Sequence, residues 1–387
     1  MPIQTDKLLV LGLFVVVVAA TVGLQMLHSQ DIAAPTTQPD HVSVPPAAPA
    51  LVGQFRGISL QLHNAEPNHP YEKYIDEIAA TGANTVCLVV TAYQENASSS
   101  SLFIEARKSP TRQRLKNLIA YAQRKGLHVA LMPIVLLENP RAKEWRGKIE
   151  PTSWDAWWED YRNYILHYAW VAEEAGVHVF VLGSELVSTE TQTEPWRALI
   201  ADVRKRYRGL LTYSANWDHY EVIEWWDQLD MIGMTTYYDL VDGENPTVAQ
   251  LCEAWKKIKA SVLKWQARID KPLLFTEVGW PNQATCAQYP WDYYRATDKP
   301  DPRAQATCFE AFFKTWIDSP AVAGFLVWEW RNHPGQNGGL KDTSYIPRGK
   351  PAMKVISRYF QMPAPASQPT QPAVEPQPVE SQPTADD

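Results

Sequence analysis

Cysteine is scarce in this sequence, and the few cysteines are not arranged to hold a metal ion. The four are Cys87, Cys252, Cys286 and Cys308, and none belongs to a CxxC pair or to a Cys/His cluster with metal-site spacing. The sequence therefore gives no sign of a metal site. The chemistry inferred below requires neither a metal ion nor an organic cofactor.

Positive charge is also lacking in the form that nucleic-acid binding requires. The formal net charge is −7, and no run or patch of Lys and Arg stands out, so we expect no nucleic-acid partner. No glycine-rich phosphate loop follows the first expected strand, which argues against a nucleotide-binding fold. Aromatic residues, in contrast, are plentiful, with 16 Trp and 17 Tyr. About half of the Trp residues can be assigned to core packing, and the others can offer flat apolar faces on which sugar rings stack.

The first 29 residues contain a long apolar run. Residues 8–24 (LLVLGLFVVVVAATVGL) follow Lys7 and are almost wholly apolar. This length is long for a signal-peptide core and at the short limit for a bilayer span. We favour an uncleaved signal anchor over a cleaved signal peptide, because the candidate cleavage residues 18–20 lie inside the run. Lys7 before the run, against Asp31 and Asp40 after it, favours an N-terminus inside and an exported chain, either membrane-anchored and facing outward (periplasm or cell surface) or secreted.

Two Pro-rich segments flank the part that can fold. Residues 30–50 have the composition of a flexible, semi-extended linker. Residues 363–387 have almost no apolar bulk and cannot offset the entropy of ordering, which predicts a disordered tail. The folded part is therefore residues 51–362, a normal size for one barrel domain, and we expect a monomer.

The folded part repeats one unit, in which an amphipathic helix is followed by a Gly and then by a short apolar strand. The helical segment 115–122, for example, precedes Gly126 and the apolar segment 128–133. Continuous apolar strands that alternate with helices indicate a parallel sheet covered by helices. Eight such strands favour a closed (β/α)8 TIM barrel over a doubly wound sheet, with helices between all strands and the weakest of these at 220–228. The expected strands are 55–60, 85–90, 128–133, 177–183, 209–214, 231–236, 272–276 and 324–328.

Polar, acidic and aromatic residues gather where these strands end. The active site of such a barrel is built from the C-terminal ends of its strands, so these residues are the candidates for function. Glu185 ends the fourth strand and Glu277 the seventh, which places both on the same rim. The other candidates are His63, Ser184, Asn216, Trp217, Asp218, Tyr237, Trp280, Trp328 and Glu329.

Two carboxyl groups on one rim are what the hydrolysis of a glycosidic bond needs. One protonates the leaving oxygen, and the other attacks the anomeric carbon or activates water. In a retaining enzyme the two groups lie about 5–5.5 Å apart. Tyr237 or Tyr238 can donate a hydrogen bond that orients the nucleophile; only one of two adjacent strand residues faces inward, and we favour Tyr237.

The segments around these residues resemble clan A glycoside hydrolases. The segments are 183–186 (GSEL), 275–280 (FTEVGW) and 328–330 (WEW). Within that clan the chain is most similar to glycoside hydrolase family 113, known for endo-β-1,4-mannanases. The resemblance extends over residues 55–360 and rests on the order and spacing of these segments around the barrel. Further stretches that support it are 145–147 (WRG), 214–218 (SANWD), 305–313 (QATCFEAFF) and 347–352 (PRGKPA).

The resemblance implies a retaining mechanism with Glu185 as acid/base and Glu277 as nucleophile. It also implies Trp328 as the floor beneath the sugar at the cleavage point, and a β-linked polysaccharide, with β-1,4-mannan favoured, as substrate. Ser184 departs from the clan, in which many members carry an Asn that binds the 2-hydroxyl. It is either a substitute ligand or only a small neighbour.

The other candidates have structural alternatives. Trp217 and Trp280 are either sugar platforms or rim packing. Glu329 is either a substrate contact or the partner of a nearby Arg or Lys. The candidate sugar ligands are His63, Asn216 and Asp218. Trp157 and Trp158 lie on a helical stripe and are expected in the core.

Two other functions compete with a β-mannanase, and a third possibility, a purely structural envelope protein, predicts no pocket of aromatic and acidic groups. One is a glycosidase or transglycosylase that acts on another β-glycan. The other is a non-catalytic carbohydrate-binding barrel, against which the two intact Glu residues argue. Fold alone does not decide among them.

Cys286 and Cys308 flank a long polar loop. In an exported protein both would lie in an oxidising compartment, and we expect a disulfide between them. Cys87, in an apolar strand, is expected to be a buried thiol.

Overall fold

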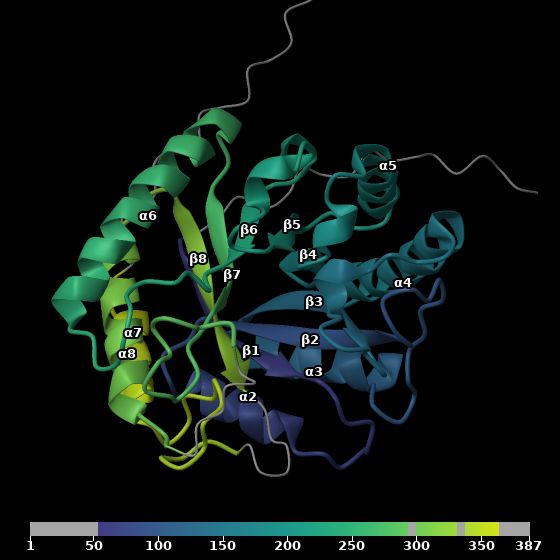
Figure 1. Cartoon of the computed structure of the whole chain (residues 1–387). Coiled ribbons are helices and arrows are strands. Elements are labelled where there is room, and N and C mark those ends of the chain that lie inside the picture. The colour runs from purple at the N-terminus through teal and green to yellow at the C-terminus, as the bar shows by residue number, and fades with distance from the viewer. Residues whose placement is uncertain (1–52, 293–298, 331–336, 364–387) are drawn as a thin grey trace, which may run out of the picture. The chain divides into compact units, whose positions relative to one another are not determined.

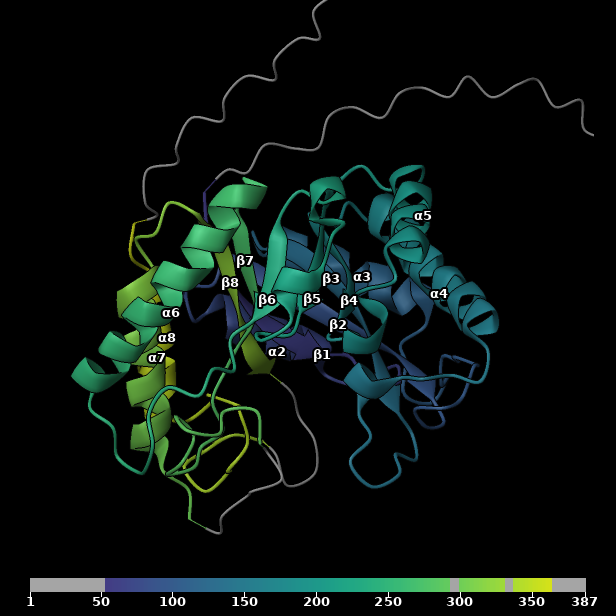
Figure 2. The same cartoon turned by 45° about the horizontal axis from the view of Figure 1, so that its top comes forward.

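The structure is a computed structural model that describes residues 53–292, 299–330 and 337–363. Eight parallel strands close into a barrel in the order β1-β2-β3-β4-β5-β6-β7-β8, with helices around it (Figures 1 and 2). The predicted (β/α)8 fold is confirmed, and each expected strand is present within a few residues. The strands are β1 (Phe55–Gln61), β2 (Thr85–Gln94), β3 (His128–Leu137), β4 (Val179–Ser184), β5 (Leu210–Ala215), β6 (Ile232–Thr235), β7 (Leu273–Val278) and β8 (Val322–Trp330).

Each strand except β5 is followed by an α-helix. Helices α6, α7 and α8 pack side by side along one wall of the barrel (Figures 1 and 2). The helices are α2 (Tyr71–Ala79), α3 (Arg112–Arg124), α4 (Trp154–Glu174), α5 (Thr193–Arg204), α6 (Val248–Ile269), α7 (Pro302–Trp316) and α8 (Pro351–Phe360).

The expectation of an α-helix between β5 and β6 is wrong. That connection contains two single 3-10 turns, η3 (Tyr220–Val222) and η4 (Trp226–Gln228). Trp225 and Trp226 are both fully buried, and Trp225 stacks on Trp196 of α5 with ring centroids 4.6 Å apart. Two large indoles cover this side of the barrel, so that a short connection suffices without a helix.

The strands read as unbroken apolar runs because both of their faces are buried. Alternate side chains such as Val89 and Val181 point into the barrel and form an inner cluster. Their neighbours Leu88 and Phe180 point outward and join the helices in a larger cluster. Trp157, on α4, is fully buried in this outer layer and Trp158 is half-buried against it, as expected.

Glycine ends two of these helices as the sequence indicates. Gly126 follows α3 with φ +79°, and Gly176 follows α4 with φ +64°. Both angles lie in the left-handed region that residues with a Cβ avoid, which is why Gly stands at these closing turns.

The end of α8 is fastened to the start of β1. The Arg56 guanidinium donates to the carbonyl oxygens of Tyr359 (3.2 Å), Phe360 (3.1 Å) and Pro363 (3.2 Å), and also to that of Met362. Carbonyls at a helix C-terminus have no partner within the helix and carry partial negative charge, which a buried guanidinium satisfies. The contact ties the last helix to the N-terminal end of the barrel.

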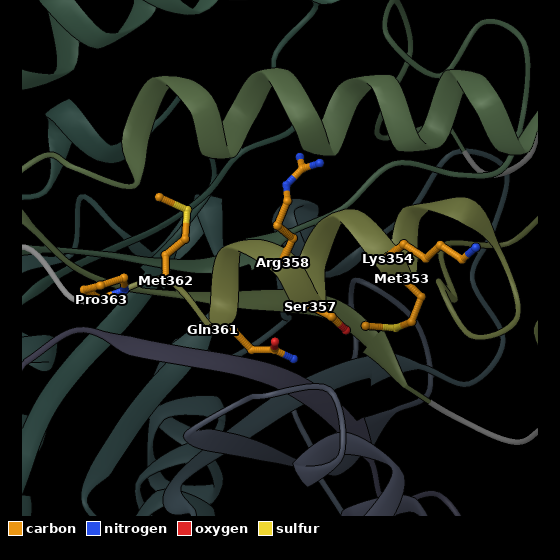
Figure 3. A pocket seen from close by; sticks show the side chains of 7 residues that line it. All are labelled: Met353, Lys354, Ser357, Arg358, Gln361, Met362 and Pro363. Atoms are coloured by element: carbon orange, nitrogen blue, oxygen red, sulfur yellow. The ribbon is translucent and has the colours of Figure 1, made fainter.

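A shallow surface pocket lies beside this helix end (Figure 3). Its lining has no carboxyl group, and Figure 3 shows the Arg358 side chain extending towards the neighbouring helix. Its lining residues all belong to α8 and to the three residues after it, and none belongs to the rim that carries Glu185 and Glu277. We therefore do not assign it to the active site. The lining residues are Met353, Lys354, Ser357, Arg358, Gln361, Met362 and Pro363.

Several predictions concern residues outside the described part. These are the apolar segment 1–29, the linker 30–50 and the tail beyond residue 363. In the part of the chain that the structure describes, no helix has the length and hydropathy needed to cross a membrane. The Sγ atoms of Cys286 and Cys308 are 3.8 Å apart and buried but not bonded, so their proximity agrees with the expectation while the disulfide stays a prediction. Cys87 is a buried thiol, as expected.

Candidate active site

The two carboxylates lie at the C-terminal rim of the barrel. Glu185 directly follows β4, and Glu277 is the penultimate residue of β7. Both are buried, with 7% of Glu185 and 2% of Glu277 exposed. Burial matters here because a carboxylate loses water on leaving solvent and must find other partners.

Arg146 joins the two carboxylates. Its Nη2 donates to Glu185 Oε2 at 2.7 Å and lies 3.8 Å from Glu277 Oε1. Since both distances run to one nitrogen, these two carboxylate oxygens are at most about 6.5 Å apart, which fits the shorter separation of retaining enzymes. Arg146 Nε also donates to the Ser184 carbonyl at 3.1 Å, which fixes the guanidinium plane.

Sequence reasoning did not select Arg146 as a site residue. It belongs to the turn η1 (Arg146–Lys148), in the long connection between β3 and α4. The motif Trp145-Arg146-Gly147 contributes to the family resemblance, and from it Arg146 could have been chosen as a site residue.

Two hydroxyl groups hold the Glu277 carboxylate. Tyr237 Oη donates to Oε2 at 2.9 Å, and Ser184 Oγ donates to Oε1 at 2.9 Å. Ser184 thus contacts the carboxylate itself, a role beyond the two alternatives considered from the sequence. Tyr238 points the other way, towards Trp217 and Trp255, as the alternation of neighbouring residues predicts.

The electrostatics of Glu277 combine opposing effects. Burial, together with the charge of Glu185, raises the pKa of Glu277 to about 8, while Arg146, Tyr237 and Ser184 act to lower it. Two close carboxyl groups resist carrying two negative charges, so Glu185 opposes the ionisation of Glu277. The site therefore holds a hydrogen-bonded, oriented Glu277 with a second carboxyl group nearby, as a nucleophile and an acid acting together require.

The backbone around Glu185 is tightly constrained. Glu185 has φ +54°, unusual for a residue with a side chain, and its N–H donates to the Ser214 carbonyl at 2.8 Å. Gly183 before it has φ +156°, and a Cβ there would lie 2.2 Å from Tyr161 Oη. Position 183 therefore accepts only glycine, which sets the turn that directs Glu185 towards the barrel axis.

A buried polar cluster supports the next residue. The Leu186 N–H donates to Tyr213 Oη at 2.8 Å, and Tyr213 Oη in turn donates to Glu190 Oε1 at 2.7 Å. His219 Nδ1 contacts the other carboxylate oxygen of Glu190. Burial raises the pKa of the wholly buried Glu190 to about 7, against the effect of His219 and Tyr213. The cluster links a half-buried His at the rim to the backbone beside Glu185, and sequence reasoning did not find it.

The candidates on β1 and β8 lie on the same rim. Glu329 is buried and accepts a hydrogen bond from Gln61 Nε2, so the structure gives it an amide partner. His63 Nε2 is 2.9 Å from Thr91 Oγ1 and is half-buried. Trp328 is half-buried at the edge of the inner cluster, as a floor of the site requires.

The candidates after β5 form a local structure of their own. Asn216 Nδ2 donates to Asp218 Oδ1 at 2.7 Å, and both side chains reach solvent. The Trp217 N–H donates to Thr235 Oγ1 at 3.1 Å, which ties this loop to the end of β6. The indole of Trp217 is half-buried and packs against Tyr238 and Trp291.

Trp280 is not a sugar platform. It is fully buried, and its ring contacts Trp255 of α6 and Phe309 and Phe312 of α7. Val278, the last residue of β7, faces the helix layer, and Trp280 lies two residues later on the same side. The alternative of packing is the correct one, and the expectation of a substrate contact is wrong.

Among the residues that the structure describes, no group of three or more His, Cys, Asp or Glu side chains could hold a metal ion. The chemistry of the rim rests on its carboxyl groups, its guanidinium and its hydroxyls. Such a set can donate a proton, attack an electrophilic carbon and stabilise the charges that result.

Comparisons with known proteins agree with this chemistry. The sequence pattern of Glycoside Hydrolase Family 113 matches residues 67–350. No curated protein sequence matches the chain. A solved complex of a GH113 β-1,4-mannanase is 28% identical, with a TM-score of 0.70 over 81% of this chain and 100% of the other. The GH113 β-mannanase of Alicyclobacillus acidocaldarius is also 28% identical, with a TM-score of 0.71 over 80% of this chain and 97% of the other.

A more distant structure shares the fold alone. The endo-β-1,4-mannanase from Thermotoga petrophila is 11% identical, with a TM-score of 0.53 over 80% of this chain and 76% of the other. The family pattern, in contrast, covers most of the chain and includes both carboxylates and Arg146. The chain therefore belongs to glycoside hydrolase family 113 and is a glycoside hydrolase.

Proposed function

We propose that this enzyme hydrolyses β-1,4-mannan with retention of configuration, with Glu277 as the nucleophile and Glu185 as the acid/base. The observation that carries the assignment is the pair of buried carboxylates joined by Arg146, with the two facing oxygens at most about 6.5 Å apart. This bound agrees with the shorter separation of retaining enzymes, in which one carboxylate attacks the anomeric carbon directly.

In the first step Glu277 attacks the anomeric carbon while Glu185 gives its proton to the leaving oxygen. The C–O bond to the leaving sugar breaks, and an ester forms between the sugar and Glu277. Tyr237 and Ser184 hold the two carboxylate oxygens of Glu277 at 2.9 Å each, and so orient it for attack.

In the second step water replaces the departed sugar. Glu185 takes a proton from this water, the resulting hydroxide equivalent attacks the anomeric carbon, and Glu277 leaves as a carboxylate. Two displacements at one carbon restore the original configuration.

Arg146 has a different task at each stage. In the free enzyme its charge favours the ionised form of Glu277, which a nucleophile needs. Its hydrogen bond to Glu185 must loosen when the leaving oxygen binds, because Glu185 then has to carry the proton. The loss of this hydrogen bond on substrate binding thereby separates the roles of the two carboxyl groups.

The choice of mannan rests on the family and on the two relatives described above, whose names give them as mannanases. Other β-glycans are the nearest alternative. The half-buried Trp328 at the floor of the site and the polar rim residues fit a sugar ring with an apolar face and a hydroxyl edge.

The test is the release of reducing ends from β-mannan by the full-length protein, with Glu277→Gln beside it. We expect release by the wild type and none by the variant, and β-configured products at early times by NMR. Release that persists in the variant would contradict the assignment of the nucleophile. Activity on a β-glucan or β-xylan but not on mannan would contradict the proposed substrate and would leave the proposed mechanism unchanged.

We also propose that the enzyme acts outside the cytosol, anchored or secreted through the apolar segment 8–24. Fractionation of cells that express the full chain tests this. Activity confined to the cytosolic fraction would contradict it.

A further inference from the structure

Exposed tryptophan is rare in this protein, and it concentrates on the catalytic rim. Of the described residues, three tryptophans are exposed: Trp145 and Trp170 at 36% each and Trp291 at 40%. Trp170 lies on the outer surface of α4, where the guanidinium of Arg112 covers its ring at 4.0 Å. The other two stand on loops that follow β3 and β7, and both loops belong to the rim that carries the carboxylates.

Trp291 does not stand alone. Its ring stacks on that of Trp217, with centroids 5.7 Å apart and planes 22° apart. The Trp217 ring packs in turn against Tyr238, 4.9 Å away. The inner indole is thus supported from below, while the outer one keeps much of its surface in water, which is costly for so large an apolar group.

Two separate routes connect this pair to Glu277. On one side the Trp217 N–H binds Thr235 Oγ1 at 3.1 Å, and Thr235 is the residue that pairs with Glu277 between β6 and β7. On the other side the Tyr345 hydroxyl donates to the carbonyl of Pro290, the residue before Trp291. The Tyr345 ring also contacts Tyr237, the hydroxyl partner of Glu277, with centroids 5.9 Å apart.

Residues shortly before Trp291 are bonded to the neighbouring connection. The Leu240 N–H donates to the Ala287 carbonyl at 3.0 Å, and Gln288 Nε2 donates to Asp242 Oδ1 at 2.8 Å. Both bonds fasten this loop to the connection between β6 and α6. An exposed aromatic surface whose supporting residues are already hydrogen-bonded is suited to binding, because less entropy is lost when a ligand settles on it.

We propose that Trp217 and Trp291 form one aromatic platform that binds a pyranose ring of the polymer away from the bond that is cleaved. The ligand is a further sugar unit of a β-linked chain, whose apolar ring face covers the exposed indole. The inference rests on the proposed function and deepens it, because a platform of this kind makes the enzyme select long chains over short ones.

The test uses full-length protein that carries Glu277→Gln, so that the glycan is bound but not cleaved. Affinity electrophoresis in gels with soluble β-mannan measures binding of this parent, and Trp291→Ala and Trp170→Ala are each added to it. We expect Trp291→Ala to weaken binding about tenfold, the loss of one well-placed aromatic contact. The matched control Trp170→Ala removes an equally exposed tryptophan and should bind as the parent does, and Trp291→Phe should recover most of the affinity.

Kinetics with an active Glu277 give a second measurement. For manno-oligosaccharides of increasing length, Trp291→Ala should leave kcat/KM unchanged on the shortest cleaved chain and lower it about tenfold on chains long enough to reach the platform. An equal loss at every length would indicate a structural effect on the site and would overturn the inference, as would unchanged binding.

Failure of the substrate assignment gives a different pattern. If mannan does not retard the parent but a soluble β-glucan or β-xylan does, the proposed substrate is wrong and the platform is judged on the glycan that binds. If none of these glycans retards the parent, the platform is refuted together with the proposed function.

Discussion

Replacing Arg146 by Met tests how the two carboxylates are tuned. The guanidinium lies 3.8 Å from Glu277 Oε1, a distance at which two unit charges interact by about 4 kcal/mol at an effective dielectric constant of about 20. The Arg146 side chain is 17% exposed, so solvent screening and relaxation reduce the net effect on Glu277 to a fraction of this figure. Without the positive charge, the pKa of Glu277 rises further, because burial and Glu185 are no longer opposed by it.

The assay is the pH dependence of kcat/KM on β-mannan. Glu277 reacts as a carboxylate, so kcat/KM rises with pH as Glu277 loses its proton, and this rise is the acidic limb of the pH profile. Arg146→Met should shift the acidic limb to higher pH by about one to two units. At neutral pH the variant should lose roughly 10- to 100-fold in kcat/KM and recover part of it at higher pH. Arg146→Lys keeps the positive charge, and its kcat/KM at neutral pH should lie between those of the wild type and Arg146→Met. A loss of the same size at every pH, with the limb unmoved, would refute the electrostatic reasoning and leave Arg146 as a structural residue.

Three further predictions follow from the site. Glu277→Gln should lower kcat by about 1000-fold or more without a change in far-UV circular dichroism, since it removes the nucleophile and keeps the hydrogen-bonding shape; residual activity within tenfold of the wild type would contradict this role. Gly183→Ala should lower the melting temperature and the soluble yield strongly, because the new Cβ meets Tyr161 Oη at 2.2 Å, whereas Gly126→Ala, with φ +79° and nothing within 4 Å, should cost only about 1 kcal/mol of backbone strain; equal losses would argue against the clash. Glu190 has its pKa raised to about 7 by burial, above the unfolded value, so its ionisation removes stability as pH rises from about 4.5 to 7. Glu190→Gln should flatten the decline of melting temperature over that window, and an unchanged slope would show that the carboxyl is ionised throughout.

The barrel was predictable from the sequence because both faces of its strands are buried. Burial on two sides demands apolar runs, and the runs alternate with helical stripes closed by glycines such as Gly126 and Gly176, so that the eight strands emerge from local patterns. The exception is the connection after β5. There Trp225 and Trp226 cover the barrel without a helix, and no local rule distinguishes two packing indoles from part of a short helix.

The carboxylate pair was predictable for a topological reason. Parallel strands end on one rim, so Glu185 and Glu277 had to meet there whatever the loops do. Arg146 was not found because it reaches the site from a long connection after β3, whose path depends on tertiary contacts. Trp280 was wrongly placed although it lies two residues after Val278, which faces the helix layer, so that strand alternation itself puts the indole on that side.

The hydrogen bonds between Arg56 and the carbonyls at the end of α8 have a consequence for how the chain folds during its synthesis. Arg56 and Phe360 are 304 residues apart. Translation proceeds at about 5–20 residues per second, so the carbonyls at the end of α8 are synthesised roughly 15–60 s after Arg56. For most of that interval β1 lacks its β8 neighbour, and throughout it β1 lacks the carbonyls that receive its guanidinium. The seam between the first and the last strand is thus expected to be among the last parts of the barrel to assemble, and the nascent protein keeps an open sheet edge until almost the whole folded part has been synthesised.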